Sequence, residues 1–226
     1  QDDVYTACLR GQHDRKVYKE HRVITSVPTL LSARAAYDAF IALAHEDSLE
    51  SVVSNTTEAG ITFDEKDAFT DCPPSTFPAK LTKFLYERYT IYKVAADKGL
   101  TMMPTELNDN NGKLLRDCVN QYVSLWKLEA PFQSWLDQHC QFTDTLVDRI
   151  VVGYPADSIA ALQDELGYED SLLDQAEPFS LWVIGVAALA TRLPLNSSKF
   201  HVVFTDHIEA FKEQKVRILN GAHTSM

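Results

Sequence analysis

Ser51-Val52-Val53-Ser54-Asn55-Thr56-Thr57-Glu58 is the stretch that decides the fold, because a β-rich run ends there in a polar turn. A helix is predicted to open at Pro78, whose fixed backbone angle suits a first helical turn, and to close at Gly99. Residues 100–103 form the next predicted strand. A strand, a helix and a second strand in this order indicate parallel pairing, in which ligands bind beyond the carboxyl ends of the strands. The polar turn and the segment 104–111 occupy such positions.

The same alternation is expected before this stretch. Residues 4–9 and 23–27 are rich in β-forming side chains. Between them and the deciding stretch, residues 32–45 show apolar side chains at helical spacing, with Ser32 placed to cap the first turn. We therefore predict an α/β fold with a partial, Rossmann-like, doubly wound sheet.

The chain changes character near residue 112. Apolar side chains recur at helical spacing just after Gly112 and again over residues 132–140, which predicts two amphipathic helices. The remainder is helix-rich and is interrupted by three β-like runs, at residues 146–152, 179–184 and 201–204. We place a domain boundary near residue 112.

The overall composition argues against several classes of partner. Thirty-two acidic residues against 21 basic residues give a net charge of −11, so we expect no sequence-independent binding to nucleic acid or to an anionic membrane. The apolar runs fall short of the roughly 18 residues that span a bilayer. Four separated cysteines without a CxxC pair favour reduced thiols, and no compact metal-ligand spacing occurs. We expect a cytoplasmic protein without a metal.

Familiar catalytic motifs are also absent from the sequence. The eight glycines never fall at the GxGxxG spacing of a dinucleotide-binding turn, and no Walker-type phosphate loop, HExxH motif or GxSxG elbow is present. Chemistry must therefore come from a less common arrangement.

The C-terminal segment offers such an arrangement. If it is helical, Asn220 lies about 140° and His223 about 80° from Lys215 around the axis, so one face presents an amine, an amide and an imidazole. Such a trio suits carbonyl reduction, since the amine can exchange a proton while the other two groups polarise the oxygen. The alternative is that Lys215 is a solvated charge, Asn220 part of a helix stop and His223 a surface residue.

Several blocks resemble the polyol-specific long-chain dehydrogenases, the mannitol dehydrogenase family. The segment Lys215-Val-Arg-Ile-Leu-Asn220-Gly-Ala-His223 is similar to the catalytic segment of that family. Other similar blocks extend over nearly the whole chain: Asn55-Thr-Thr-Glu-Ala-Gly-Ile61, Pro104-Thr-Glu-Leu107, Thr145-Leu-Val-Asp-Arg-Ile-Val151 with Gly153-Tyr-Pro155, and Glu177-Pro-Phe-Ser-Leu-Trp182. Within the family, the blocks that begin at Asn55 and Thr145 are most similar to those of the tagaturonate reductase (altronate oxidoreductase) branch.

The resemblance implies a metal-independent oxidoreductase that interconverts D-tagaturonate and D-altronate by hydride transfer with NAD. Its partner would be a small sugar acid, and nothing in the sequence predicts an oligomeric state. Lys215 would act as the general acid/base, with Asn220 and His223 holding the reacting oxygen. Asp148 and Glu58 match positions that face the substrate.

The resemblance also implies where the cofactor binds and how much of the enzyme is present. Asn55, Thr56 and Thr57 would line the cofactor groove. Family members have a strand and a glycine-rich turn before the segment that resembles residues 1–6, and they continue beyond the catalytic helix. We therefore expect an internal fragment. Residues 1–112 would be a partial dinucleotide-binding domain without its glycine-rich turn, and residues 113–226 the start of a mainly helical substrate domain, both incomplete.

One position departs from the family pattern. Mannitol-type members carry a second oxygen-binding asparagine where Leu107 stands here. Asn108, Asn110 or Asn111 could substitute, or that contact could be absent in this branch. Three alternatives to the tagaturonate activity stay open: a neutral polyol as substrate, fructuronate as substrate, or a truncated segment without catalytic activity.

Overall fold

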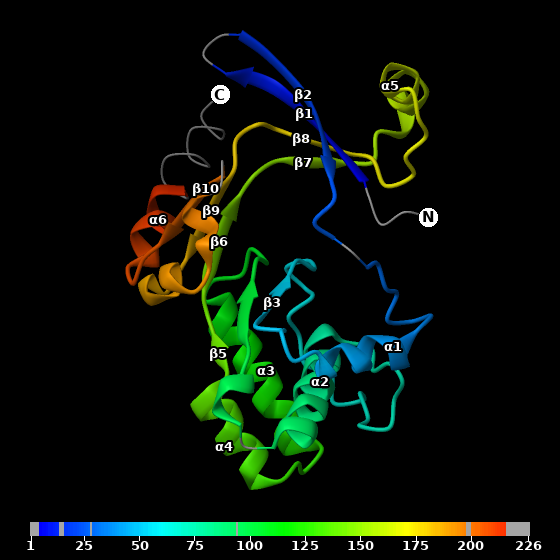
Figure 1. The fold of residues 1–226 in the computed structure, drawn as a ribbon. Coiled ribbons are helices and arrows are strands. Elements are labelled where there is room, and N and C mark those ends of the chain that lie inside the picture. Colours follow the sequence, from blue (N-terminus) through cyan, green and yellow to red (C-terminus); the bar gives the residue numbers. More distant parts are fainter. Residues whose placement is uncertain (1–4, 14–15, 28, 94, 198–199, 216–226) are drawn as a thin grey trace. The chain divides into compact units, whose positions relative to one another are not determined.

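The computed structural model describes residues 5–13, 16–27, 29–93, 95–197 and 200–215 (Figure 1). Contacts within the chain divide it into two units. One combines Gln1–Leu30 with Asp148–Leu181, and the other combines Leu31–Val147 with Trp182–Met226. In the described part of the chain, no helix has the length and apolar character needed to cross a membrane.

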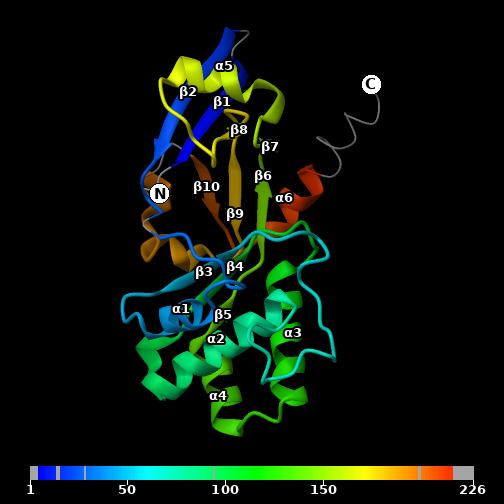
Figure 2. The same cartoon turned by 90° about the vertical axis from the view of Figure 1, so that its right-hand side faces the viewer.

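The larger unit contains the parallel sheet that the sequence predicts. Strands β3 (Ser51–Ser54), β4 (Thr101–Pro104) and β5 (Gln141–Phe142) lie side by side in that order, with β4 in the centre (Figures 1 and 2). All four residues of β4 are buried. Such burial is typical of a parallel strand that is covered on both faces. The strands predicted at 51–54 and 100–103 are thus confirmed.

Helices connect these strands. Helix α2 (Phe77–Tyr92) leads from β3 to β4, and α3 (Asn111–Leu125) and α4 (Ala130–His139) lead from β4 to β5. The N-cap of α2 is Thr76, whose hydroxyl accepts a hydrogen bond from the Ala79 N–H at 3.2 Å. The helices expected at Pro78, after Gly112 and over 132–140 are confirmed.

One apolar core holds these elements together. Its fully buried side chains come from α2, α3, α4, β4 and the residue just before β4, and include Leu85, Leu100, Met102, Val119, Phe132 and Trp135. Short elements pack nearby: α1 (Tyr37–Ala42), continued by the 3-10 turn η1 (Leu43–His45), and the 3-10 turn η2 (Ala96–Lys98). Buried apolar area of this size is the main favourable contribution to folding.

The same unit carries a second sheet of three strands, ordered β10-β9-β6. Its strands are β6 (Thr145–Asp148), β9 (Leu181–Ile184) and β10 (His201–Phe204). The turns η4 (Ala187–Thr191) and η5 (Pro194–Ser197) lie between β9 and β10, and the helix α6 (Ile208–Gln214) follows β10.

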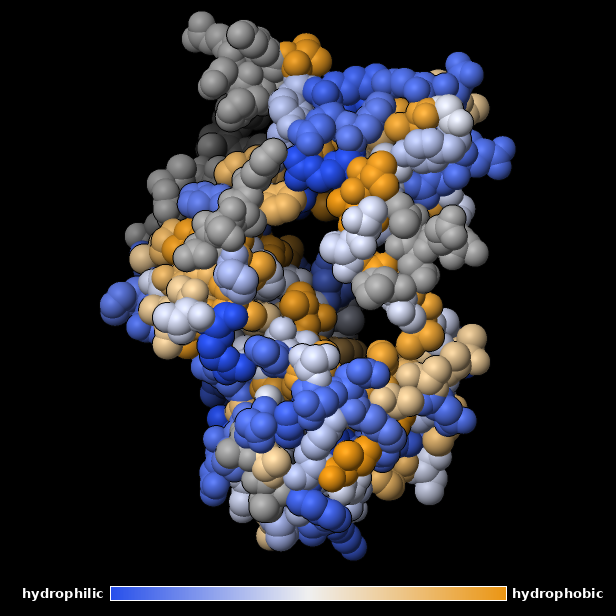
Figure 3. All heavy atoms as spheres, in the orientation of Figure 1, coloured by the Kyte–Doolittle hydropathy of each residue, from blue (hydrophilic) through white to orange (hydrophobic). Residues whose placement is uncertain are grey.

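The smaller unit is built on a hairpin. Strands β1 (Tyr5–His13) and β2 (Lys16–Ile24) pair antiparallel, β8 (Asp174–Ala176) pairs parallel with β1, and β7 (Val151–Gly153) pairs antiparallel with β8. The turn η3 (Ala156–Ser158) and the helix α5 (Ile159–Leu166) complete the unit. Figure 3 shows mostly hydrophilic side chains around β1, β2 and α5, where Lys19 Nζ lies 2.6 Å from a Glu165 carboxylate oxygen.

Two predictions for the start of the chain were wrong. The strands at the start of the chain form the hairpin and do not join the parallel sheet, and the second of them begins at Lys16 and ends at Ile24. Ser32 does not cap a helix: its carbonyl closes a separate turn with Ala35 and Ala36, and α1 starts only at Tyr37.

Helix α2 ends at Tyr92 and not at Gly99. Lys93 adopts a left-handed backbone angle (φ 54°), which stops the helix. Gly99 is needed for another reason, since a Cβ at this position would lie 1.7 Å from the His139 carbonyl oxygen. The glycine therefore permits a close approach between chain segments.

The α/β class with a Rossmann-like parallel sheet is confirmed, and the domain division stays a prediction. Residue 112 lies in the first turn of α3, inside the larger unit, because α3 shares one core with α2 and β4. The described residues after 112 contain six strands, β5 to β10, as well as four helices, α3 to α6.

Candidate functional site

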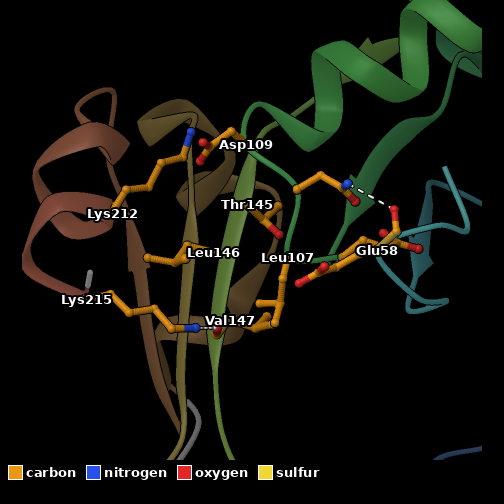
Figure 4. Close-up of a pocket in the computed structure, with 10 residues that line it drawn as sticks. Glu58, Leu107, Asp109, Thr145, Leu146, Val147, Lys212 and Lys215 are labelled. Carbon is orange, nitrogen blue, oxygen red and sulfur yellow. Dashed lines mark hydrogen bonds between the residues drawn. The ribbon is translucent and has the colours of Figure 1, made fainter. Parts of the chain in front are cut away.

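A cavity of about 200 Å³ lies beyond the carboxyl end of β4, within the larger unit (Figure 4). It is lined by Glu58, by Glu106, Leu107, Asn108 and Asp109, by Thr145, Leu146 and Val147 of β6, and by Lys212 and Lys215. The two loops that the sequence analysis placed at strand ends therefore meet here. The end of a parallel strand is the usual position of a ligand in such sheets.

The carboxylate of Glu106 connects these two loops. Its Oε2 accepts a hydrogen bond from the Ser54 hydroxyl at 2.9 Å, and its Oε1 accepts from the N–H of Thr56 at 2.9 Å and from the Thr56 hydroxyl at 2.7 Å. Glu106 is only 4% exposed. A buried carboxylate needs such donors, because burial without them is costly. The Glu106 side chain thus fixes the turn after β3 to the loop after β4.

Glu106 was not predicted as a site residue from the sequence. The only signal was an acidic residue shortly after the strand predicted at residues 100–103, in the block Pro104-Thr-Glu-Leu107. Its partners lie about fifty positions away, so no local spacing marked it.

The turn after β3 contains the three residues expected at the cofactor. Asn55, Thr56 and Thr57 are all exposed to solvent. The backbone N–H and hydroxyl hydrogen of Thr56 are already donated to Glu106, whereas the side chains of Asn55 and Thr57 are open to a ligand. A Cβ at Gly60 would lie 2.0 Å from Thr56 Oγ1, so this tight turn requires glycine.

Asn111 does not replace the asparagine that Leu107 lacks. Its Nδ2 lies 2.9–3.0 Å from three backbone carbonyl oxygens, those of Pro104, Glu106 and Thr145, which share its two hydrogens. Its Oδ1 accepts from the N–H groups of Gly112 and Thr145. With 1% exposure and all of these bonds made, Asn111 is a structural residue that holds α3 against β6.

Of the other two candidates, Asn108 lines the cavity. Its Nδ2 donates to the Glu58 carbonyl at 3.0 Å, and its Oδ1 is buried without a hydrogen-bond partner among the residues that the structure describes. Asn110 has a left-handed backbone angle at the N-cap of α3, and its Oδ1 accepts from Lys212. Leu107 itself is 60% exposed.

Lys215 follows α6 directly and reaches the cavity. Its Nζ donates to the Val147 carbonyl at 2.8 Å, and Figure 4 shows its side chain extending toward β6. Asn220 and His223 lie outside the described residues. The proposed trio of amine, amide and imidazole therefore stays a prediction.

The two acidic residues expected to face the substrate lie at different places. Glu58 is exposed and lines the cavity. Asp148 is the last residue of β6, directly after Val147, and is not among the residues that line the cavity. Within the described ranges, no group of three or more His, Cys, Asp or Glu side chains could hold a metal ion.

Comparisons with known proteins agree with this architecture. Two solved structures share the fold: the ternary complex of Pseudomonas fluorescens mannitol 2-dehydrogenase with NAD and D-mannitol (TM-score 0.74, 24% identity) and a D-sorbitol dehydrogenase in substrate-free form (TM-score 0.77, 22% identity). Each alignment covers 99% of this chain and 46% of the other chain.

Curated relatives are closer in sequence. The chain is 49% identical to an altronate oxidoreductase of Yersinia enterocolitica serotype O:8 and 46% identical to one of Pectobacterium carotovorum subsp. carotovorum. Each alignment covers the whole of this chain and 47% of the relative, so the chain spans about half the length of these relatives.

The family match extends over most of the chain. Residues 2–197 match the family described as mannitol dehydrogenase Rossmann domain. This match includes both loops at the strand ends and most of the cavity wall, and it confirms the resemblance seen in the sequence blocks. The chain therefore belongs to the mannitol dehydrogenase family and carries its Rossmann domain.

Proposed function

We propose that the complete protein containing this chain is an oxidoreductase that interconverts D-tagaturonate and D-altronate with NAD. The observation that carries the proposal is the position of Lys215, whose ammonium group lies in a cavity at the carboxyl end of the central parallel strand. In a Rossmann-like sheet this is where the reacting ends of cofactor and substrate meet.

The chemistry divides between the cofactor and the protein. A nicotinamide cofactor supplies or accepts the hydride at the reacting carbon. In the reducing direction, Lys215 Nζ donates a proton to the carbonyl oxygen, and in the oxidising direction it takes the hydroxyl proton back. Asn220 and His223 are proposed to hold that oxygen through hydrogen bonds, which stabilise the negative charge that develops on it. Zinc is not required in this scheme, because Lys215 performs the proton transfer.

The turn after β3 fits a polar group of the cofactor. Asn55 and Thr57 are exposed beyond the end of β3, while Glu106 holds Thr56 and keeps the turn in one conformation. We propose that Asn55 and Thr57 contact the cofactor and that Thr56 positions them. Glu58, on the cavity side of the same turn, is proposed to contact the substrate, and Asp148 to do so from the end of β6.

The substrate class follows from the relatives. Altronate oxidoreductases at 46–49% identity support a sugar acid, a small molecule, as the substrate. A cytoplasmic location is part of the proposal, and the net charge of −11 argues against nucleic acid or an anionic membrane as a partner.

The test is a substrate panel on the full-length protein, followed through NADH absorbance. A hexonate brings a carboxylate that must meet a cation when it is desolvated. We therefore expect kcat/KM for D-tagaturonate to exceed that for D-fructose by well over tenfold. Equal rates on D-tagaturonate and D-fructose would identify a polyol dehydrogenase. A preference for fructuronate would identify fructuronate as the substrate. No turnover of any of these compounds would favour a non-catalytic protein.

A further inference from the structure

The cavity contains a second ammonium group, which the proposed reaction does not use. Lys212 lies on α6, and Lys215, three residues later, follows the helix with helical backbone angles, so the two side chains leave the same face. Figure 4 shows both reaching from α6 toward the cavity. Among the described residues that line it, Lys212 and Lys215 are the cationic ones.

The Lys212 side chain is held in place. It is 13% exposed, and its Nζ donates to Asn110 Oδ1 at 3.2 Å and to Glu209 Oε1 at 2.9 Å. Asn110 belongs to the loop that follows β4, whereas Glu209 lies one turn earlier on α6. The ammonium group is therefore positioned at the cavity wall before any ligand binds.

The rest of the cavity wall would repel an anion. Glu58, Glu106 and Asp109 all contribute carboxylates to the lining. Glu106 accepts hydrogen bonds from the Ser54 and Thr56 hydroxyls, so these two donors are already used within the protein. A substrate carboxylate that enters this cavity therefore needs a cationic partner, because an unpaired charge is costly to desolvate.

The helix N-terminus beside the cavity is not available for that role. The first turn of α3 would be a natural anion site, since its N–H groups have no partner within the helix. Here Asp144 Oδ1 already accepts from the N–H of Gly112 at 2.8 Å and from that of Lys113 at 3.2 Å. The protein's own carboxylate thus occupies the position that a ligand carboxylate would take.

We propose that Lys212 binds the carboxylate of the sugar-acid substrate and so determines the preference for an acid over a neutral ketose. The inference rests on the proposed function, in which Lys215 exchanges the proton at the ketone. A keto-hexonate carries its ketone and its carboxylate on one carbon chain. Side chains three residues apart on one helix face have Cβ atoms about 5–6 Å apart. Two ammonium groups in this arrangement can contact the ketone and the carboxylate of one substrate molecule.

Binding would replace a weak interaction with a stronger one. Glu209 is 70% exposed, and such solvent-exposed ion pairs contribute little free energy. A substrate carboxylate inside the cavity would accept a charge-assisted hydrogen bond from the Lys212 ammonium in a less hydrated environment. Asn110 would keep the ammonium in position during this exchange.

The test compares two substrates that differ only in the carboxylate, D-tagaturonate and D-tagatose, on the full-length protein. Lys212→Met should lower kcat/KM for D-tagaturonate by about 30-fold, within the range for a lost hydrogen bond to a charged group, and mainly through KM. The same variant should leave kcat/KM for D-tagatose within about threefold of the parent. Lys212→Arg, which keeps the charge, should restore much of the preference for the acid.

The control is Lys113→Met. The Lys113 side chain is 70% exposed, pairs with Asp117 and does not line the cavity, so this variant should behave as the parent on both substrates. Lys212→Gln provides a second neutral variant, and the thermal unfolding midpoint of each variant verifies folding.

Each outcome has a distinct meaning. If the parent prefers D-tagaturonate and both neutral variants keep that preference, the assignment of Lys212 is overturned and the proposed function stands. If the parent itself shows no preference for D-tagaturonate, the proposed function fails, and the role of Lys212 fails with it. An equal loss on both substrates would make Lys212 a structural residue and would also overturn the assignment.

Discussion

Thr56 and Glu106 form a two-point contact between loops that are fifty residues apart in the sequence. Glu106 Oε1 accepts from both the backbone N–H and the hydroxyl of Thr56, at 2.9 Å and 2.7 Å. A backbone donor and a side-chain donor on one oxygen fix both the position and the rotamer of Thr56. The turn expected to meet the cofactor is thus shaped by a residue from the neighbouring strand end.

Removing this contact should destabilise the protein. Glu106→Ala leaves the Ser54 hydroxyl and the Thr56 N–H without their acceptor, so we expect a loss of about 2–3 kcal/mol in the free energy of unfolding. Urea denaturation of the full-length protein measures it. The control is Glu169→Ala, at an exposed position, which should change stability by less than about 0.5 kcal/mol. Equal effects of the two variants would contradict a structural role for Glu106.

Even a lysine in place of Arg88 should destabilise the protein. Arg88 is 0% exposed, and its guanidinium donates to four backbone carbonyls, those of Ala44, Glu46, Leu49 and Lys98. A lysine ammonium cannot match this planar set of donors, so Arg88→Lys should cost about 2 kcal/mol or more in unfolding free energy.

The comparison for Arg88 is Arg116→Lys. Arg116 is 43% exposed and pairs with Asp137 at the surface, so this variant should cost less than about 0.5 kcal/mol. Thermal unfolding of both variants provides the readout. If the Arg88→Lys variant is as stable as the parent, the hydrogen bonds from the guanidinium to the four carbonyls do not contribute to the stability of the fold.

The elements that could be predicted from the sequence are those with local signals. Strand β3, the start of α2 and strand β4 follow from β-branched or apolar runs, a proline in the first helical turn and an apolar pattern, all within a few residues. The end of α2 could not be predicted, because Lys93 turns left-handed and the Lys98 carbonyl is engaged by Arg88. Both events depend on tertiary structure.

The hairpin β1–β2 illustrates a second reason why some elements could not be predicted from the sequence. Residues 16–22 of β2 mix charged and apolar side chains and show no strong alternation, yet they pair along their whole length with β1. Backbone hydrogen bonds with a partner strand set this element, not side-chain periodicity. At the site, Glu58 and Lys215 were predicted from sequence blocks, whereas Glu106 and Lys212 become apparent only when distant loops and α6 meet at one cavity.

Asp67 should make stability depend on pH in the acid range. Burial alone would raise the pKa of Asp67, but hydrogen bonds from Ser75 and Thr76 outweigh burial and lower the pKa to about 2 from its ordinary 3.8. A lowered pKa stabilises the fold above the ordinary value, and the stabilisation is lost as the pH falls through the folded-state value. We expect a loss of about 2 kcal/mol between roughly pH 5 and pH 2 from this group.

The test is the thermal unfolding midpoint from pH 5 to pH 2. Asp67→Asn removes the titrating group, so its stability should be lower at pH 5 and should fall less toward pH 2 than that of the parent. Asp157→Asn, at an exposed position, should follow the parent curve. Parallel curves for Asp67→Asn and the parent would exclude Asp67 as a source of the acid sensitivity.

The four cysteines should differ widely in reactivity. Burial raises the pKa of Cys140 to about 12 and also raises the pKa of Cys8 and Cys118. Cys72 is exposed, and its Sγ lies 3.7 Å from the Lys83 Nζ. Because the thiolate is the reactive form, iodoacetamide at pH 8 should label Cys72 first.

Peptide mass spectrometry of the labelled native protein separates these thiols. The Cys72 peptide should be alkylated within the time in which the Cys140 peptide stays unmodified, and urea should abolish the difference. Rapid labelling of Cys140 in the native protein would contradict its burial.

Lys215 should be required for the chemical step and not for binding. Lys215→Met keeps much of the side-chain volume and removes the proton donor, so kcat of the full-length enzyme should fall by about a hundredfold or more, the range for a lost general acid or base. KM for D-tagaturonate should change little, in contrast to Lys212→Met, which should act mainly on KM. A kcat within threefold of the parent would overturn the role of Lys215 as general acid/base and leave it a residue that donates to the Val147 carbonyl.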